Sequence, residues 1–353
     1  MTDPLVSVVM RVFDNEQYLS SSIESVLNQT FPDFELLIIS EYDTSQESLR
    51  IIDSYRDERI RHIHNAVRLG LVRSLNEGLT NANGRYVAPF DSDDVNSPLR
   101  FEKQLQFLDE HPEVGVLGTR YDVINEEGRV IERPKPTLET ELNKWRLLFG
   151  ECVVAHSSAM VRREVYSKLG GYNPDVHYAE DYELWVRSLS VTHIANLPDT
   201  LLQLRKHPMR VSIAHELAQQ QNTLFISQRA LSSTFGVEVP IHYLDVIMSH
   251  RIVGGKDTFE VASWMFERCR EYVLKNNMRK KDENSIRAFT AKKLYPLALM
   301  CTRKWPSYSA RIWRLILELD PVGSTRLSGD LLRRMAVYPL KLAHCSLKFG
   351  MDG

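Results

Sequence analysis

Short apolar runs alternate with amphipathic segments along the first part of the chain. The run Leu5–Met10 is rich in β-branched residues, which is typical of a strand buried on both faces of a parallel sheet. The segment after it carries Leu19, Ile23 and Val26 at positions i, i+4 and i+7, on one face of a helix. The same patterns predict strands at 34–39, 60–64, 86–90 and 114–117, and helices at 45–55, 72–81 and 100–111. This alternation predicts right-handed βαβ units, and therefore an α/β fold with a mostly parallel sheet.

The pattern changes after residue 120. Residues 121–131 are typical of a hairpin with its turn at Glu126-Glu127-Gly128. Further along we predict a strand at 157–161, helices at 163–169 and 181–190, and an extended segment at 194–204. After His215 the periodicity is helical and no chemical motif occurs. We therefore expect a catalytic α/β domain over residues 1–214 and a mainly helical region over residues 215–353.

The segment Tyr86–Asp94, YVAPFDSDD, is a short apolar run that ends in three carboxylates, Asp91, Asp93 and Asp94. A strand here delivers these acids to the carboxyl edge of the sheet, where open α/β sheets bind ligands. Acids this close repel one another and are tolerated mainly where a cation neutralises them. Hard oxygen ligands that leave coordination positions open suit Mg²⁺ or Mn²⁺ shared with a phosphate. The segment therefore suggests a metal–diphosphate site.

We considered two other interpretations of the same segment, a helix cap and an EF-hand loop. Ser97-Pro98 has the form of a helix N-cap followed by proline at the first helical position, so the acids and serines could belong to a cap. Asp91, Asp93 and Glu102 also fall at positions 1, 3 and 12 of a calcium-binding EF-hand loop. The EF-hand interpretation fails because Val95 and Asn96 occupy the positions that need an oxygen ligand and a glycine.

The composition is that of an ordinary globular protein, with 353 residues, 43% of them hydrophobic and 25% charged. No apolar run approaches the roughly 18–20 residues that a membrane helix needs. The N-terminus lacks the basic region of a signal peptide. The four cysteines are scattered without a C-x-x-C pair, which favours reduced thiols over a zinc site or a disulfide framework. We expect a cytoplasmic protein.

The net charge of −2 conceals an uneven distribution. Residues 279–353 carry 15 Lys and Arg against 6 Asp and Glu, whereas the rest of the chain is acidic. A basic tail of amphipathic helices suggests peripheral contact with an anionic membrane surface. A solvated helical face, packing on the catalytic domain or a homodimer contact explains the same pattern, and we expect no nucleic-acid partner.

The positions of several other polar residues make them candidates for binding or catalysis. Glu41 follows the second strand at the same sheet edge, where a carboxylate can accept from a nucleobase N–H or a ribose hydroxyl. Glu180-Asp181 begins an apolar helix, so the pair serves either as helix capping or as a general base for an attacking hydroxyl. His156 and His207 are each isolated in sequence, and a lone histidine is more often structural than a ligand. No nucleophile elbow or P-loop occurs, so hydrolase and P-loop nucleoside-triphosphatase functions lack support.

Taken in order, five segments resemble the family-2 glycosyltransferases of GT-A fold, the inverting enzymes of bacterial polysaccharide and glycolipid assembly. They are PLVSVVMRVFDNEQYLSSSIESVLNQTFPDFELLIIS, RLGLVRSLNEGLTNANGRYVAPFDSDD, HSSAMVRREVYSKLGGYN, AEDYELW and LRKHPMRVS. The resemblance covers residues 4–214. It implies a Rossmann-like, mostly parallel sheet flanked by helices, here with a helical C-terminal extension.

The resemblance implies roles for the matching acids and for His207. Asp91 and Asp93 form the D-x-D that, with Asp94, holds Mn²⁺ or Mg²⁺ on the diphosphate of a nucleotide-sugar donor. His207 matches a histidine that completes this metal site. Asp181, with Glu180 beside it, matches the acidic pair whose aspartate is the catalytic base. The residues implied in donor binding are Val12, Phe13, Asp14, Glu41, Arg68, Asp91 and Ser92.

By this resemblance the enzyme transfers a sugar, with inversion, from a nucleoside-diphosphate donor, for which we expect UDP. The acceptor is then a hydroxyl of a saccharide or a lipid-linked molecule. Glu41 replaces the family's usual aspartate, Tyr42 follows it, and Arg11 replaces a proline often found after the first strand, so the base and sugar preference stays open. A catalytically degenerate sugar-nucleotide-binding scaffold and a nucleotidyltransferase are the alternative functions. The latter needs a Gly-rich phosphate loop after the first strand, which MRVFDNEQYL is not.

Overall fold

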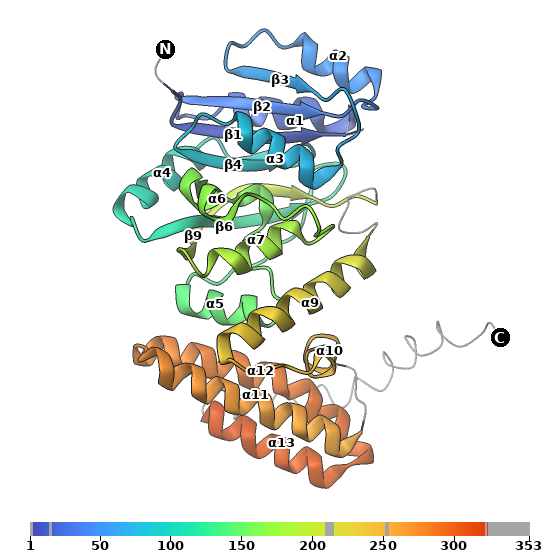
Figure 1. Cartoon of the computed structure of the whole chain (residues 1–353), viewed down its shortest axis with the longest axis vertical. Coiled ribbons are helices and arrows are strands. Elements are labelled where there is room, and N and C mark those ends of the chain that lie inside the picture. Colours follow the sequence, from blue (N-terminus) through green and yellow to red (C-terminus); the bar gives the residue numbers. More distant parts are fainter. Residues whose placement is uncertain (1–2, 14–15, 209–214, 251–253, 322, 324–353) are drawn as a thin grey trace, which may run out of the picture. The chain divides into compact units, whose positions relative to one another are not determined.

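The computed structural model describes residues 3–13, 16–208, 215–250, 254–321 and 323 (Figure 1). The chain divides into two compact units, residues 1–239 and residues 240–353. This division falls beyond position 214 because helix α9 (Glu216–Phe235) belongs to the first unit. The Ser227 hydroxyl of α9 lies 2.7 Å from the Tyr182 hydroxyl, within that unit.

In the described part of the first unit, one sheet of nine strands forms the framework (Figure 1). Its order is β3-β2-β1-β4-β8-β6-β9-β5, and β7 pairs with β6. The pairs β1–β2, β1–β4, β2–β3 and β6–β9 are parallel, while β5, β7 and β8 run antiparallel to their neighbours. The strands are β1 (Val6–Val12), β2 (Phe34–Ser40), β3 (Ile60–His64), β4 (Tyr86–Asp91), β5 (Val95–Asn96), β6 (Val114–Ile124), β7 (Val130–Glu132), β8 (Met160–Arg162) and β9 (His193–Arg205). The predicted mostly parallel α/β sheet is confirmed.

Helices cover both faces of this sheet. On one face Val8 of β1 packs in a core with Leu19 and Phe101, and on the other Val9 packs in a core with Trp185. Successive residues of β1 are buried on opposite faces because side chains alternate along a strand. The first core receives α1 (Glu16–Leu27), α2 (Gln46–Ser54) and α4 (Arg100–Glu110), and the second receives α3 (Leu71–Asn81), α5 (Thr140–Leu148), α6 (Arg163–Leu169) and α7 (Glu180–Ser188).

Two local predictions need correction. Ser97 is not a helix N-cap, because its backbone N–H donates to the Leu201 carbonyl beside the β5–β9 pair and α4 begins only at Arg100. The strand predicted at 157–161 begins late: residues His156–Ser158 form a short 3₁₀ helix, η1, before β8. The Ser158 hydroxyl donates to the Ala155 carbonyl there, a local bond that competes with strand pairing.

The second unit is helical in its described part, as predicted for the C-terminal region. Its helices are α10 (Ile241–Ser249), α11 (Gly255–Asn276), α12 (Lys280–Lys304) and α13 (Pro306–Leu319). Among the described residues, no helix has both the length and the apolar character needed to span a bilayer. Residues 324–353, which contain much of the basic tail, lie outside the described residues.

Candidate active site

The acid cluster lies at the carboxyl edge of the parallel strands. Asp91 is the last residue of β4, and the turn after it carries Asp93 and Asp94. One carboxylate oxygen from each of the three aspartates lies within 4.8 Å of the others. Asp93 and Asp94 are buried, while the Asp91 side chain is 38% exposed. The cluster therefore presents one accessible and two buried carboxylates to a common point.

The end of β9 holds this turn in place. The Arg205 guanidinium donates from Nε to the Asp93 carbonyl at 2.9 Å, and the Arg205 backbone N–H donates to Asp94 Oδ1 at 2.8 Å. The same guanidinium lies 4.4 Å from the centre of the Tyr18 ring. His207 follows, with Nε2 2.8 Å from Asp93 Oδ2. Residues far apart in sequence thus fix the direction of the aspartates, while positions 209–212 of the LRKHPMRVS motif lie outside the described residues.

The second acidic pair begins helix α7. Burial and the neighbouring Asp181 charge raise the pKa of Glu180 to about 7. Burial also raises the pKa of Asp181, against the opposing effect of His156. Asp181 Oδ1 accepts from the Tyr182 N–H at 2.7 Å, so this carboxylate also accepts a hydrogen bond within the first turn of its own helix. A carboxyl pair with raised pKa values is well suited to take up a proton near neutral pH.

His156 links the two acidic groups. Its Nδ1 lies 3.3 Å from Asp91 Oδ1, and its Nε2 lies 3.0 Å from the Tyr172 hydroxyl. Burial alone would lower the pKa of His156. The hydrogen bond and charge of Asp91, with the charges of Asp181 and Glu180, outweigh burial and raise this pKa to about 9. An imidazolium therefore balances the negative charge between the D-x-D and the acidic pair.

The residues expected at the nucleotide lie at the ends of β1 and β2. Glu41 is fully buried, and its two oxygens accept from the Leu69 N–H and the Ser74 hydroxyl, each at 2.7 Å. Its carboxylate also lies 3.7 Å from Arg11. This carboxylate thus ties β2 to the segment that leads into α3.

An aromatic and cationic cluster lies beside Glu41. The guanidinium groups of Arg11 and Arg68 each lie 5.0 Å from the centre of the Phe13 ring. Arg68 also pairs with Asp43 at 3.1 Å. Val12 is buried at the end of β1, and Asp14 lies outside the described residues.

The structure brings Asp91, Ser92, Asp93, Asp94 and His207 into one cluster around the turn after β4. His156 contacts Asp91 of this cluster and is close enough to Glu180 and Asp181 for their charges to raise its pKa. Sequence reasoning undervalued His156, whose signal was its place in AHSS just before a predicted strand. Arg205 was also missed, although it stands two residues before His207 in the same motif.

The sequence matches the model of glycosyl transferase family 2 over residues 7–170. It is 30% identical over 224 residues to the uncharacterized glycosyltransferase MJ1057 of Methanocaldococcus jannaschii, a match covering 63% of this chain and 77% of that protein. It is 34% identical over 207 residues to the O-antigen biosynthesis glycosyltransferase WbnJ of Escherichia coli, covering 58% and 80%.

Solved structures show which fold the chain has. Residues 1–349 of S. aureus TarS in complex with UDP-GlcNAc match with a TM-score of 0.55 at 16% identity, over 89% of this chain and 88% of that one. The mannosyltransferase PcManGT of Pyrobaculum calidifontis in complex with GDP-Man and Mn²⁺ matches with a TM-score of 0.50 at 15% identity, over 87% and 89%. At such identities these matches show the fold alone. The chain belongs to glycosyl transferase family 2 and has the GT-A fold.

Proposed function

We propose that the enzyme transfers a sugar, with inversion at the anomeric carbon, from a nucleoside-diphosphate donor to a hydroxyl of a saccharide or lipid-linked acceptor. The observation that carries this proposal is the placement of two acidic groups around His156. One group is the aspartate cluster whose oxygens lie within 4.8 Å of one another. The other is the pair Glu180-Asp181, whose pKa values are raised. Donor diphosphate and proton acceptor would thus meet at one sheet edge.

The residues fit a hard divalent cation. Asp91, Asp93 and Asp94 offer only carboxylate oxygens, which suit Mg²⁺ or Mn²⁺ and leave positions for phosphate and water. His207 Nε2 already contacts Asp93, so direct coordination through that nitrogen would replace this hydrogen bond. When bound, the metal would neutralise charge on the diphosphate leaving group.

The protein side chains would perform the remaining steps. Asp181 accepts the proton of the acceptor hydroxyl as that oxygen attacks the anomeric carbon from the face opposite the diphosphate. Its raised pKa makes it a better base than an ordinary aspartate. The charges of Glu180 and Asp181 interact, so we expect the observed pKa values to describe the pair and not either residue alone. His156 holds Asp91 in position and offsets the negative charge of the site.

Residues at and after the ends of β1 and β2 would select the donor nucleotide. Glu41 would act by holding the segment at Leu69, while Phe13 and Arg68 would lie against the base. We propose UDP as the nucleotide, in line with the UDP-GlcNAc complex of TarS, although PcManGT was captured with GDP-Man. The names of relatives such as WbnJ support a role in polysaccharide assembly.

Donor hydrolysis with a panel of UDP- and GDP-sugars tests the proposal. With Mn²⁺ the wild type should release nucleoside diphosphate from one donor class, and EDTA should stop the release. Asp93→Ala removes a buried member of the aspartate cluster and should lower the rate about 10²-fold or more. Asp199→Asn, at a half-buried ion pair with Lys103, is the control and should keep the wild-type rate. Equal hydrolysis by D93A and wild type would contradict the role of Asp93 in the metal site. Absence of hydrolysis of every donor by the wild type would favour the scaffold alternative.

We also propose that the enzyme works in the cytoplasm, with its basic C-terminal region on the inner membrane surface and a homodimer as the alternative use of that region. Residues 279–353 carry the excess of Lys and Arg on which this rests. Flotation with anionic liposomes should show binding at low salt that is lost at high salt. Absence of flotation at low salt would contradict the membrane proposal. Analytical sedimentation would then test whether the protein forms a homodimer.

A further inference from the structure

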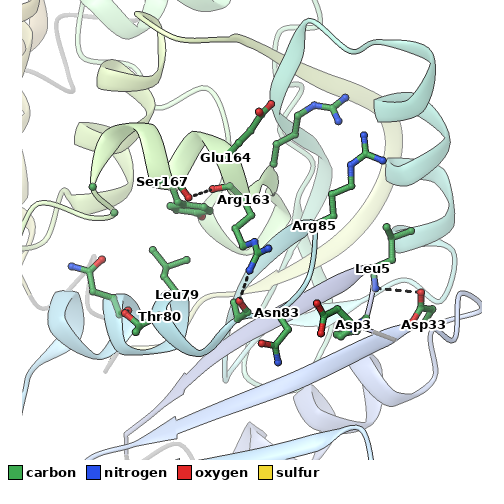
Figure 2. Close-up of a pocket in the computed structure, with 17 residues that line it drawn as sticks. Asp3, Leu5, Asp33, Leu79, Thr80, Asn83, Arg85, Arg163, Glu164 and Ser167 are labelled. Atoms are coloured by element: carbon green, nitrogen blue, oxygen red, sulfur yellow. Dashed lines mark hydrogen bonds between the residues drawn. The ribbon is translucent and has the colours of Figure 1, made fainter. Parts of the chain in front are cut away.

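A pocket lies at the amino ends of the parallel strands, whereas the acid cluster lies at their carboxyl ends; Figure 2 shows the residues that line the pocket. Its volume is about 1000 Å³. Leu5, Asp33 and Arg85 line it, and each directly precedes one of the parallel strands β1, β2 and β4. The acid cluster follows the carboxyl end of β4, and a strand of this length spans about 20 Å. The pocket is therefore separate from the proposed catalytic site.

Two opposite charges face this pocket without pairing. Asp3 forms no ion pair or hydrogen bond with a described residue. The Arg85 guanidinium lies 5.5 Å from the centre of the Tyr86 ring and donates to none of the residues that the structure describes. In Figure 2 Asp3 lies below Arg85, with Arg163 near the centre of the pocket, where it donates to the Ala82 carbonyl at 3.0 Å. Hydrogen-bonding groups of both kinds are thus left for a ligand.

The lining indicates the chemistry of that ligand. Three arginines are balanced by three carboxylates, so neither a phosphate nor a cation is favoured by net charge. A sugar hydroxyl both donates and accepts, and so satisfies guanidinium and carboxylate groups together. Leu5 and Leu79 provide apolar surface for the C–H face of a pyranose ring. The charged lining residues are Arg85, Arg162, Arg163, Asp3, Asp33 and Glu164.

We propose that this pocket is a second saccharide-binding site, which retains a neutral stretch of the glycan between transfers. The proposal rests on the proposed saccharide acceptor. Holding a glycan on the enzyme raises the effective concentration of its end near the catalytic site, without any new catalytic contact. Its role is retention, so loss of the pocket should leave donor hydrolysis unchanged.

The choice of variants follows from the contacts. Tyr166 lines the pocket, but its hydroxyl lies 3.3 Å from that of Tyr172, which contacts His156. Changes at Tyr166 would therefore disturb the catalytic side. Arg85→Ala removes the guanidinium, and Ser167→Trp fills the pocket from the exposed face of α6. Arg50→Ala on α2, an exposed arginine outside the pocket, is the matched control.

The experiment measures binding of neutral hexasaccharides of glucose, mannose, galactose or N-acetylglucosamine to the full chain, by saturation-transfer NMR and calorimetry. At least one should bind to the wild type, about tenfold more weakly to R85A and S167W, and equally to R50A. Inorganic pyrophosphate should not compete. No binding by any member, unchanged binding in both pocket variants, or competition by pyrophosphate overturns the proposal.

Two further readouts separate this site from the proposed function. D93A should bind the hexasaccharide as the wild type does, since the aspartate cluster is distant. Saccharide binding without donor hydrolysis would reject the proposed function alone, whereas hydrolysis without saccharide binding would reject the pocket alone. Circular dichroism of each variant excludes misfolding as the cause of a loss.

Discussion

Replacing the proposed catalytic base should make the protein more stable and less active at once. In Asp181→Asn the amide keeps an oxygen for the Tyr182 N–H, so this hydrogen bond in the first turn of α7 is retained. The change removes one of two neighbouring carboxylates whose pKa values are raised by burial. Turnover should fall about 10²-fold or more because the acceptor proton has no base.

The size of the stability gain follows from Glu180. Its pKa of about 7, against 4.5 for an ordinary glutamate, means that the folded state binds this proton more tightly than the unfolded state. The contribution of Glu180 to the free energy of unfolding is then fully present below pH 4.5 and is lost as the pH rises to about 7. The loss is about 3 kcal/mol at most, at 1.36 kcal/mol per pKa unit. Burial is the main cause of the shift and the charge of Asp181 the second. Removing that charge should therefore recover about 1–2 kcal/mol at pH 8 and much less at pH 5.

Urea unfolding at pH 5 and pH 8, followed by tryptophan fluorescence, measures this gain, since Trp185 is buried in α7. Asp175→Asn, an exposed aspartate shortly before α7, is the matched control and should change stability by less than about 0.5 kcal/mol. A loss of stability in D181N at pH 8, or a gain of equal size at both pH values, would refute the electrostatic reasoning. Near-normal turnover would refute the assignment of the base.

Two further predictions concern the residues that hold the site together. Arg205→Met keeps much of the side-chain volume but loses the hydrogen bond to the Asp93 carbonyl, so Mn²⁺-dependent nucleotide affinity should fall about tenfold by calorimetry; unchanged affinity would show that the turn needs no such support. Glu41→Ala leaves the Leu69 N–H and the Ser74 hydroxyl without their buried acceptor, which should cost about 3 kcal/mol in urea unfolding and weaken nucleotide binding. Wild-type stability in E41A would contradict the structural role of this carboxylate.

The sequence predicted the sheet because β1, β2 and β4 are apolar runs whose burial dominates local alternatives. It was less informative where local bonds compete, as at Ser158, or where a residue serves the sheet and precedes a helix, as Ser97 does. The aspartate cluster could be predicted because Asp91, Asp93 and Asp94 lie close together in the sequence.

Contacts between residues far apart in the chain could not be predicted from the sequence. Arg205 meets Asp93 across more than one hundred residues, and His156 meets Asp91 across more than sixty. Each is an ordinary polar residue in its own segment, and only the pairing of β4 with β8 and of β5 with β9 brings it to the aspartates. Such roles depend on topology, which periodicity alone does not supply.

The central claim is tested most directly by calorimetric binding of UDP, GDP and dTDP to the wild type, with and without Mn²⁺, and to D93A. Binding of one nucleotide, UDP by our proposal, only in the presence of Mn²⁺ and only to the wild type is the predicted result. Absence of binding by any nucleotide to well-folded wild-type protein, or equal binding by D93A, would contradict a metal–diphosphate site at Asp91, Asp93 and Asp94.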